Sequence, residues 1–414
     1  MVYVISEKGN ALMPTTPAKA RVLLKGGRAK CVRRTPFTIK LLYETTEYTQ
    51  ELTHGIDTGS AAMGSAVVDN KGNVAYISEI ELRNDITEKM KQRAKNRRNR
   101  RSRKTRYRQT RWENRRNSKR KERFTPTMTS KIESHIREIN YVQSILPVTG
   151  VILETTTFDA HALKNPDVLE NKELYQRGIN YGYANTRAYV LNRDGYMCQI
   201  CKGKSQDKHL QTHHIIYRSN GGSDEADNLA CLCRSCHDGV HEGRVELKLK
   251  GKTKGQLSHA TQMNSIRRQL LRRVDCEETF GFVTKEHRQL QGLAKTHYTD
   301  AAVIASRGGD IQFKVNQLLL KKCISDGDSQ QTKGVRSEQR IPTGKIQGYR
   351  KFDKVRYRGE EYFIKGRMTS GYAILMDIHG NKAELKPIPK FSRLRRLSVR
   401  KSWIIQAKTI QSIV

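Results

Sequence analysis

Residues 198–241 read CQICKGKSQDKHLQTHHIIYRSNGGSDEADNLACLCRSCHDGVH, and this stretch decides how the middle of the chain folds. It holds two Cys-x-x-Cys pairs, Cys198/Cys201 and Cys233/Cys236. That spacing closes a tetrahedral zinc site and ties together a short element that has too little apolar core to fold alone. We therefore expect a structural Zn²⁺ on these four cysteines.

The histidines of the same stretch carry a second chemistry. The imidazole of His214 titrates near neutral pH and suits a general base that takes a proton from water attacking a phosphodiester. His213 and His237 are expected to ligate one Mg²⁺ or similar ion, which stabilises the developing charge, and Asn228 to brace the loop that holds His214. A zinc ribbon that binds DNA without cutting it explains the cysteines but not these polar residues at these intervals.

From Cys198 to His241 the chain resembles the HNH endonuclease family, because His213-His214-Ile215, Asn228 and His237 match that family's motif. The family often has Asp at the position of His213, and its RNA-guided members often have Asn at the position of His237. His241 is then a candidate additional ligand.

A second set of candidate catalytic residues is spread over the chain. Asp57 stands in a Gly-Ile-Asp-Thr-Gly-Ser run that follows a predicted strand, and Glu154 ends a buried-looking strand. His297 and Asp300 share one face of a predicted helix. Each residue alone is typical of a structural or solvated position. Together they predict a two-metal cluster that positions water for in-line attack on a phosphate.

The bulk composition indicates a polyanionic partner. The 414 residues include 78 Lys and Arg against 41 Asp and Glu, which gives a formal net charge of +37 at a mean hydropathy of -0.73. Such charge opposes compaction unless a nucleic acid neutralises it. No run approaches the ~20 apolar residues of a spanning helix, and the chain opens on strand-like residues 2–5, so we expect no membrane partner, reduced cysteines and a location in the cytoplasm or nucleoid of a prokaryote.

The basic residues are concentrated between Lys91 and Arg123, where 18 of 33 residues are Lys or Arg and no Pro or Gly interrupts a helix. A helix of that length spans roughly 50 Å. Residues spaced to track phosphates along one face are Arg93, Arg97, Arg101, Lys104, Arg108, Arg111 and Arg115. The alternative is a segment that stays disordered until a polyanion arrives.

The rest of the pattern predicts a small α+β unit over residues 1–50, a β-meander over 55–82, an amphipathic helix carrying Ile132, Ile136 and Ile139, and a linker over 325–348. Short strands are predicted at 354–358, 362–368, 372–377 and 382–385.

The order of the acidic segments, with the Cys/His block between the second and third, resembles a RuvC nuclease divided into three pieces. The whole chain resembles the IscB family, transposon-associated RNA-guided nucleases related to the large CRISPR effector nuclease with RuvC and HNH domains. Ala11-Leu12-Met13-Pro14 is similar to that family's Pro-Leu-Met-Pro signature. Ala11 replaces its first Pro, and Thr58 replaces the Pro that commonly follows the catalytic Asp; neither change removes a metal ligand.

The resemblance implies an α/β multidomain fold with an RNase H-like split RuvC core, an inserted ββα-metal HNH module, a long basic bridge helix and a small C-terminal β-barrel-like domain. The expected segments are an N-terminal domain (1–52), RuvC segment I (53–88), the bridge helix (89–127), RuvC segment II (128–183), the HNH domain (184–245), RuvC segment III (246–322), and a linker with the C-terminal domain (323–414). That last domain would contact a short motif flanking the target; simple SH3-like packing or a protein-contact module is the alternative.

The resemblance also implies the partners and the division of labour. Mg²⁺ or Mn²⁺ would serve both nuclease sites, beside the structural Zn²⁺. A structured non-coding guide RNA (omega RNA) would direct a monomer in the RNA complex to double-stranded DNA. Asp57, Glu154, His297 and Asp300 would cut the displaced strand, and the His214 site the strand paired to the guide. The competing hypotheses are a guide-free HNH/RuvC nuclease of homing or restriction type and a catalytically silent RNA-binding protein.

Overall fold

The computed structural model describes residues 1–102, 124–155, 157–159, 162–163, 166–251, 256–325 and 345–410. It divides into two compact units, one of Met1–Thr156 with Ser265–Val414 and one of Thr157–Asn264. Both units combine helices and strands, so the predicted mixed α/β multidomain class is confirmed. None of the helices in these residues is long and apolar enough to cross a membrane.

The first unit is built on one mixed sheet whose described strands run in the order β11-β8-β5-β6-β7-β13-β18, with β12 also paired to β7. The strand bounds are β5 Leu52–Asp57, β6 Ala62–Asp69, β7 Asn73–Glu81, β8 Gly150–Glu154, β11 Glu277–Thr279, β12 Gln312–Phe313, β13 Gln317–Cys323 and β18 Trp403–Thr409. The antiparallel run β5-β6-β7 is the predicted meander. Strand β8 runs parallel to β5, and β11 parallel to β8.

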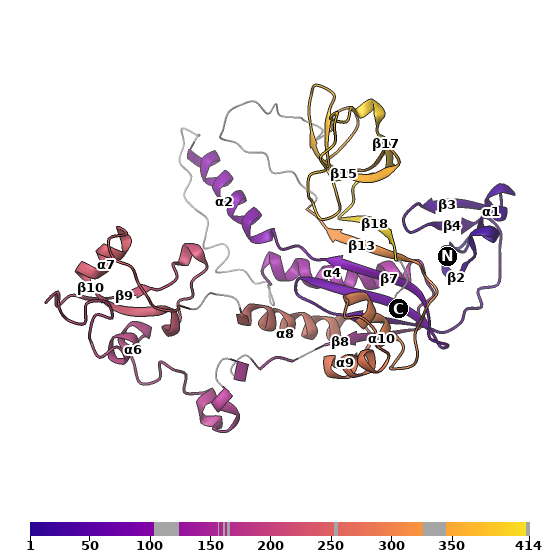
Figure 1. Ribbon diagram of the computed structural model, residues 1–414. Helices are drawn as coiled ribbons and strands as arrows, with labels where there is room; N and C mark the ends of the chain where they lie inside the picture. The colour runs from indigo at the N-terminus through magenta and orange to yellow at the C-terminus, as the bar shows by residue number, and fades with distance from the viewer. Residues whose placement is uncertain are drawn as a thin grey trace. The chain divides into compact units, whose positions relative to one another are not determined.

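Helices cover both faces of this sheet (Figure 1). Side chains alternate along β6, so Ala66 and Val68 pack with helix α10 (His297–Ala305) on one face, whereas Val67 packs with Val142 of helix α4 (Pro126–Gln143) on the other. Ile132 and Ile139 of α4 are buried as predicted, while Ile136 is half-buried. The sheet is therefore buried on both sides where α10 crosses it.

Local sequence signals set where these helices begin. Thr125 precedes Pro126, and its side chain accepts a hydrogen bond from the backbone N–H of Met128. Thr296 accepts from the backbone N–H of Thr299 in the same way. A threonine cap satisfies an otherwise unpaired donor of the first turn, and Pro at the first position loses no hydrogen bond there. Helices α8 (Gln256–Arg273) and α9 (Gly281–Leu290) precede α10.

The N-terminal residues form the predicted α+β unit. Strands β1 (Val2–Ile5), β2 (Ala11–Thr15), β3 (Ala29–Arg33) and β4 (Thr38–Leu41) run in the order β2-β1-β4-β3. Helix α1 (Pro17–Lys25) packs on the sheet through the buried Ala20. Two of these strands, β2 and β3, were not separately predicted.

The C-terminal region differs from its prediction in two ways. Strands β14 (Lys354–Tyr357), β15 (Glu360–Arg367) and β16 (Ala373–Met376) form as expected, but residues 382–385 are not a strand, and β17 (Arg395–Ser398) completes the order β16-β15-β14-β17. Prolines 387 and 389 follow residues 382–385 and lack the N–H that a ladder requires. Strand β18 leaves this region and pairs antiparallel with β13 of the core sheet, so the final strand belongs to the central sheet.

The basic segment is helical as far as it is described, in α2 (Ile86–Ser102). Arg93 and Arg97 are exposed on it, as phosphate contact requires. The side chain of Arg101 and the predicted phosphate contacts Lys104, Arg108, Arg111 and Arg115 lie outside the described residues, as does most of the predicted linker.

The second unit is small. Strands β9 (Leu210–His214) and β10 (Leu229–Cys233) form an antiparallel pair, flanked by helices α6 (Thr186–Arg193) and α7 (Arg234–His241). Single 3₁₀ turns stand at Pro166–Leu169, Lys172–Tyr175, Arg218–Asn220 and Ala226–Asn228. Its apolar clusters are small, and one of them contains Cys198, Cys233 and Cys236.

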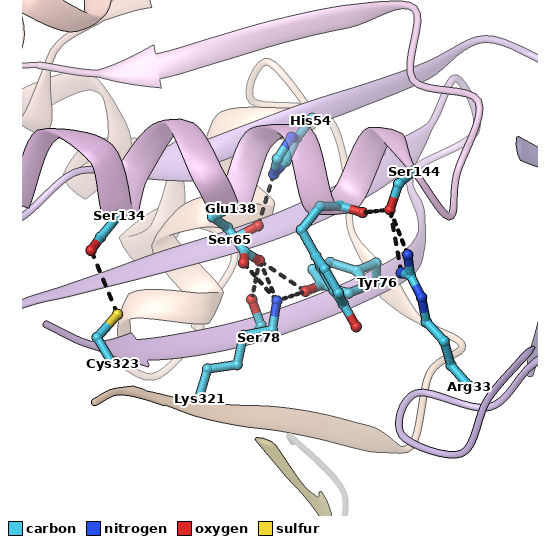
Figure 2. Close-up of polar contacts among 11 residues, drawn as sticks. Arg33, His54, Ser65, Tyr76, Ser78, Ser134, Glu138, Ser144, Lys321 and Cys323 are labelled. Atoms are coloured by element: carbon cyan, nitrogen blue, oxygen red, sulfur yellow. Dashed lines mark hydrogen bonds and ion pairs between the residues drawn. The ribbon is translucent and has the colours of Figure 1, made fainter. Parts of the chain in front are cut away.

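A buried ion pair joins α4 to the central sheet (Figure 2). Lys321 of β13 and Glu138 of α4 are both fully buried, and the Lys321 ammonium lies 2.6 Å and 2.8 Å from the two Glu138 carboxylate oxygens. The hydroxyls of Tyr76 and Ser78 on β7 donate to Glu138 Oε1 at 2.8 Å and 2.9 Å. The ammonium also lies 4.0 Å from the centre of the Tyr141 ring. Burial lowers the pKa of Lys321, and Glu138 opposes that shift.

This network generates a prediction on stability. Lys321→Met leaves the Glu138 carboxylate buried without its cation, so we expect a loss of about 3–5 kcal/mol in the free energy of unfolding, measured by urea denaturation. The neighbouring Lys322→Met is the control, because Lys322 pairs with Glu81 at the surface and such pairs contribute about 1 kcal/mol or less. The double variant Lys321→Met/Glu138→Leu should recover most of the loss; a double variant as unstable as the sum of the two single variants would contradict the pairing.

Candidate active sites

The first candidate site lies where two parallel strands of the first unit end side by side. Asp57, the last residue of β5, is directly opposite Glu154, the last residue of β8. Residues opposite each other on neighbouring strands project from the same face of a sheet, so the two carboxylates share one face. The Thr58 hydroxyl donates to the backbone oxygen of Glu154 at 2.6 Å and ties the two strand ends together. This threonine stands where the family commonly has Pro.

Helix α10 completes the site because two glycines let it approach the sheet. A side-chain carbon on Gly64 would overlap the backbone oxygen of His297, and one on Gly55 would overlap the backbone oxygen of Ala301. Gly64 is also opposite Asp57 in the β5-β6 pairing. Because glycine has no side chain at these two positions, the first turn of α10 can lie directly over the strand that ends in Asp57.

The structure thus brings the predicted residues of this site together. His297 Nδ1 lies 2.6 Å from Asp57 Oδ2, and this hydrogen bond raises the pKa of His297. Asp300, one helical turn further, pairs with Arg288 of α9 at 2.7 Å between Nε and Oδ1. Burial raises the pKa of Asp300, although the Arg288 charge opposes the rise.

Glu154 is the most perturbed carboxyl of the group. Burial raises its pKa to about 7, and the nearby charges of Asp57 and Asp300 add to that rise, while a hydrogen bond with Thr284 opposes it. Raised pKa values in a cluster of carboxyl groups indicate that the surrounding protein does not fully offset their negative charge. Oxygen donors of this kind are the ligands that Mg²⁺ and Mn²⁺ prefer, so the residues present fit a divalent cation.

The second unit holds two further groups, one of Cys and one of His side chains, whose possible ligand atoms lie close enough together to enclose one ion. In the first group, the sulfurs of Cys198, Cys201, Cys233 and Cys236 all lie within 4.8 Å of one another, and all four are free thiols. The Cys201–Cys233 sulfur separation is 3.8 Å. Sulfurs at about 2.3 Å from a tetrahedral zinc ion are about 3.8 Å apart, so this group fits structural zinc. A hydrogen bond from Ser205 lowers the pKa of Cys201 to about 6, which favours the thiolate that zinc needs.

The second group is made of histidines. Ring nitrogens of His213 on β9 and of His237 and His241 on α7 lie within 4.8 Å of one another. Residues four apart on a helix share a face, which puts His237 and His241 on the same side. Burial lowers the pKa of His213 to about 4, so its imidazole is neutral and able to ligate at pH 7. His241 therefore joins the predicted pair of His213 and His237, and three imidazole donors suit Zn²⁺ better than Mg²⁺.

His214 lies beside this group, at the end of β9, and points to a different partner. Its Nε2 lies 2.9 Å from Asp224 Oδ1, and Arg218 Nε lies 2.6 Å from the same oxygen. A carboxylate on one ring nitrogen orients the imidazole and leaves the other free to take a proton. Buried Asn228 closes the loop that follows His214. Its Oδ1 accepts a hydrogen bond from the backbone N–H of Ile216 at 3.0 Å, and its Nδ2 donates to the backbone oxygen of Ile216 at 2.9 Å. This is the predicted bracing role.

Sequence reasoning missed three residues of these sites. Arg288 carries no motif, and only the packing of α9 beside α10 brings it to Asp300. Thr284, which forms a hydrogen bond with Glu154, is likewise not part of any recognisable motif. Asp224 had a usable signal, because it follows the Gly-Gly turn at 221–222 within the loop that returns to Asn228.

The raised pKa of Glu154 predicts proton release when a metal binds the first site. At pH 6 the carboxyl is mostly protonated because its pKa is about 7, and a divalent ion must displace that proton. Apparent Mn²⁺ affinity should therefore rise about tenfold per pH unit up to about pH 7 and then level off. Titration calorimetry with Mn²⁺ at pH 6, in two buffers of different ionisation enthalpy, measures the number of protons released. The protein carries His213→Ala so that the histidine group does not bind the added ion. The pKa values of His297 and Asp300 are also raised, so Glu154→Gln should release about one proton fewer per bound ion rather than none. Equal release by Glu154→Gln would refute the assignment.

The cysteine group predicts a matched pair of variants. Cys198→Ser should lose the bound zinc, about one ion per chain by metal analysis, and lower the melting temperature of the second unit, because zinc substitutes there for an apolar core. Cys231→Ser is the control: Cys231 is also buried, between the paired cysteines in sequence, but it is not one of the four clustered sulfurs. Equal zinc content in both variants would show that the four sulfurs are not the ligands.

Comparison with known proteins finds two family models on this chain. Residues 2–178 match the RRXRR protein family, and residues 198–243 match the HNH endonuclease family. The second match contains both metal-binding groups and His214.

Individual relatives are similar over short stretches. Anaredoxin of Nostoc sp. (strain PCC 7120) is 30% identical over 69 residues, which are 17% of this chain and 88% of that protein. The type IV methyl-directed restriction enzyme EcoKMcrA of Escherichia coli K12 is 34% identical over 62 residues, 13% of this chain and 22% of that enzyme.

Solved structures with local similarity are Cas9 enzymes. Streptococcus thermophilus Cas9 in complex with the AGAA PAM aligns at TM-score 0.34 and 9% identity over 61% of this chain, which spans 32% of the Cas9 chain. The type II-C Cas9 of Actinomyces naeslundii aligns at TM-score 0.17 and 16% identity, over 45% of this chain and 22% of that enzyme. Scores this low establish no common fold, so the assignment rests on the two family models. An RRXRR region followed by an HNH endonuclease domain supports an IscB-like RuvC/HNH nuclease.

Proposed function

We propose that the protein is an RNA-guided, metal-dependent DNA endonuclease that cuts the two strands of its target at two separate sites. The observation that carries this proposal is the coexistence of two groups with nuclease chemistry in different units. One is the cluster of Asp57, Glu154, His297 and Asp300 at the ends of β5 and β8 and the start of α10. The other is His214 beside the three-histidine group.

The topology around Asp57 supports a RuvC assignment for the first site. An RNase H-like sheet has three antiparallel strands followed outward by parallel ones, and the order β7-β6-β5-β8-β11 follows that pattern. We propose that residues 53–88, 128–183 and 246–322 are the three RuvC segments, of which residues 157–183 and 246–264 fall in the second compact unit. Bound divalent cations would supply charge stabilisation at the scissile phosphate. Asp57, Glu154 and Asp300 would hold them. His297 was expected to be a further ligand, but its Nδ1 lies 2.6 Å from Asp57 Oδ2, so it would instead orient that carboxylate.

The second site acts on the other strand. His214 takes the proton from the attacking water, and Asp224 holds the ring in the orientation that leaves Nδ1 available. His213, His237 and His241 would hold an ion whose charge stabilises the leaving oxygen. In this proposed division of labour the HNH site cuts the strand paired to the guide and the RuvC site cuts the displaced strand. The four cysteines would hold a structural Zn²⁺.

RNA guidance is supported by the charge distribution. The chain has a net charge of +37, and Arg93 and Arg97 of α2 are exposed, as contact with a polyanion requires. We propose that α2 and the basic residues after it are the bridge helix and hold a structured omega RNA. The C-terminal sheet would read a short motif beside the target, since guide pairing reads the remaining sequence. The assembly would be a monomer with one RNA, encoded with a transposon.

A second candidate is a guide-free HNH/RuvC endonuclease of restriction type. It is favoured by the 34% identity to a methyl-directed restriction enzyme over 62 residues. Such an enzyme would cut its DNA after complete removal of RNA.

Strand-specific cleavage tests the proposed sites. Asp57→Ala should leave cutting of the guide-paired strand and slow cutting of the displaced strand by about 10²-fold or more, and His214→Ala should do the reverse. The readout is a target duplex labelled with a different dye on each strand. His209→Ala is the control, because His209 is an exposed histidine of the same unit with no place in either site, and it should cut both strands. Residual double-strand cutting by the Asp57→Ala/His214→Ala variant would overturn the assignment.

A further inference from the structure

A cavity of about 480 Å³ lies in the first unit, away from the carboxylate cluster. Its walls come from residues 31–35 at the end of β3, from α4, from β14 and β15, and from residues 397–405 that lead into β18. The volume lies within the range of sites that hold small ligands, about 300–1,000 Å³. Neither proposed nuclease site uses these residues.

The lining is strongly basic. The described residues around the cavity include no Asp or Glu, whereas the cationic ones are Arg33, Arg34, Arg137, Lys354, Arg400 and Lys401. Lys354 is neutralised by Glu361 at 2.6 Å. Arg33 instead donates to the uncharged hydroxyl of Ser144 at 3.2 Å and 3.3 Å (Figure 2), so its charge is not cancelled by that contact. A cavity with this balance favours an anion.

The same cavity presents aromatic rings. Tyr141, Phe352, Phe363 and Trp403 line it, and the rings of Tyr141 and Trp403 are 5.9 Å apart at an angle of 56°. Arg137 lies 5.8 Å from the Trp403 ring centre. Planar rings beside guanidinium groups are the surfaces on which unstacked bases are held in single-stranded nucleic acid sites.

Trp403 also points to a ligand with hydrogen-bond acceptors. Only 8% of this residue is exposed, and its indole N–H has no hydrogen-bond partner among the described residues. An indole nitrogen is a donor only, and a buried donor without an acceptor is costly. A purely apolar ligand would leave this donor unpaired, and inorganic phosphate would leave the rings unused.

We infer that this cavity binds one unstacked nucleotide of the nucleic acid that the protein carries, with the phosphate at Arg33 and Arg137 and the base against Trp403 and Tyr141. The inference rests on the proposed function only in requiring a bound nucleic acid; it requires no cleavage. A nucleotide uses the cations, the rings and the indole donor together. The nucleotide belongs either to the RNA or to a DNA strand, and both present this chemistry.

Tryptophan fluorescence tests the site, because the chain has two tryptophans, Trp112 and Trp403. In a full-length Trp112→Phe protein freed of nucleic acid, Trp403 is the sole reporter. The pentanucleotides rA5 and dA5, added without divalent metal, should quench its emission saturably, since a stacked base quenches indole. Ribose 5-phosphate should not. The tighter of the two pentanucleotides identifies RNA or DNA as the source of the nucleotide.

Matched charge variants separate this site from general attraction to a basic protein. Arg137→Gln should weaken quenching by rA5 or dA5 about tenfold, because it removes a charge-assisted contact. Arg21→Gln removes the same charge from the exposed face of α1, outside the cavity, and should change affinity by no more than about twofold. Arg33→Gln repeats the test if Arg137→Gln lowers the melting temperature.

The absence of quenching by both pentanucleotides, or equal losses in the Arg137 and Arg21 variants, would overturn the inference. The assay contains no metal and no cleavage step, so its failure is distinct from failure of the proposed nuclease activity. Normal DNA cutting without quenching would mean that this cavity is not a nucleotide site, and the two proposed nuclease sites would stand.

Discussion

The pairing of β5 with β8 is the constraint on which the candidate RuvC site depends. Their parallel register places Asp57 opposite Glu154, and the glycines at 55 and 64 clear the space through which α10 brings His297 and Asp300 to the same point. Three segments far apart in sequence meet there because backbone pairing and close packing fix them, not because the acidic groups attract one another. Burial is the main cause of the raised pKa values of Glu154 and Asp300, and repulsion by the neighbouring carboxylates adds to it. The buried Lys321–Glu138 pair holds α4 against the opposite face of the same sheet.

The second unit solves a different physical problem. Its strand pair and short helices bury only small apolar clusters, so a zinc ion on the four clustered cysteine sulfurs would supply the cross-link that a larger core provides elsewhere. The same strand that ends in His214 carries His213, and one helical turn supplies His237 and His241. His213, a proposed metal ligand, and His214, the proposed base, are therefore neighbours on one strand with different roles.

Local patterns predicted much of this fold and less of its long-range pairing. Three predictions rested on residues that are close in sequence. The structure confirms the strands within residues 62–82, the clustering of the two Cys-x-x-Cys pairs, and the helix on which His297 and Asp300 lie three residues apart. The pairing of β18 with β13 joins residues at least 80 positions apart, and no local pattern in the sequence indicates it. Arg288 and Lys321 become meaningful only through partners on other elements, Asp300 and Glu138, and a single sequence contains no record of those contacts.

The nucleic acid that the protein retains tests the central claim of RNA guidance most directly. The chain is purified from a cell that carries its surrounding genomic segment, washed at high salt to remove loosely bound polyanions, and the remaining nucleic acid is sequenced. The account predicts one abundant structured RNA of constant sequence with a variable end, in about equal amount to the protein. Random cellular RNA, or none, with DNA cutting that persists after ribonuclease treatment, would contradict it and leave a guide-free nuclease.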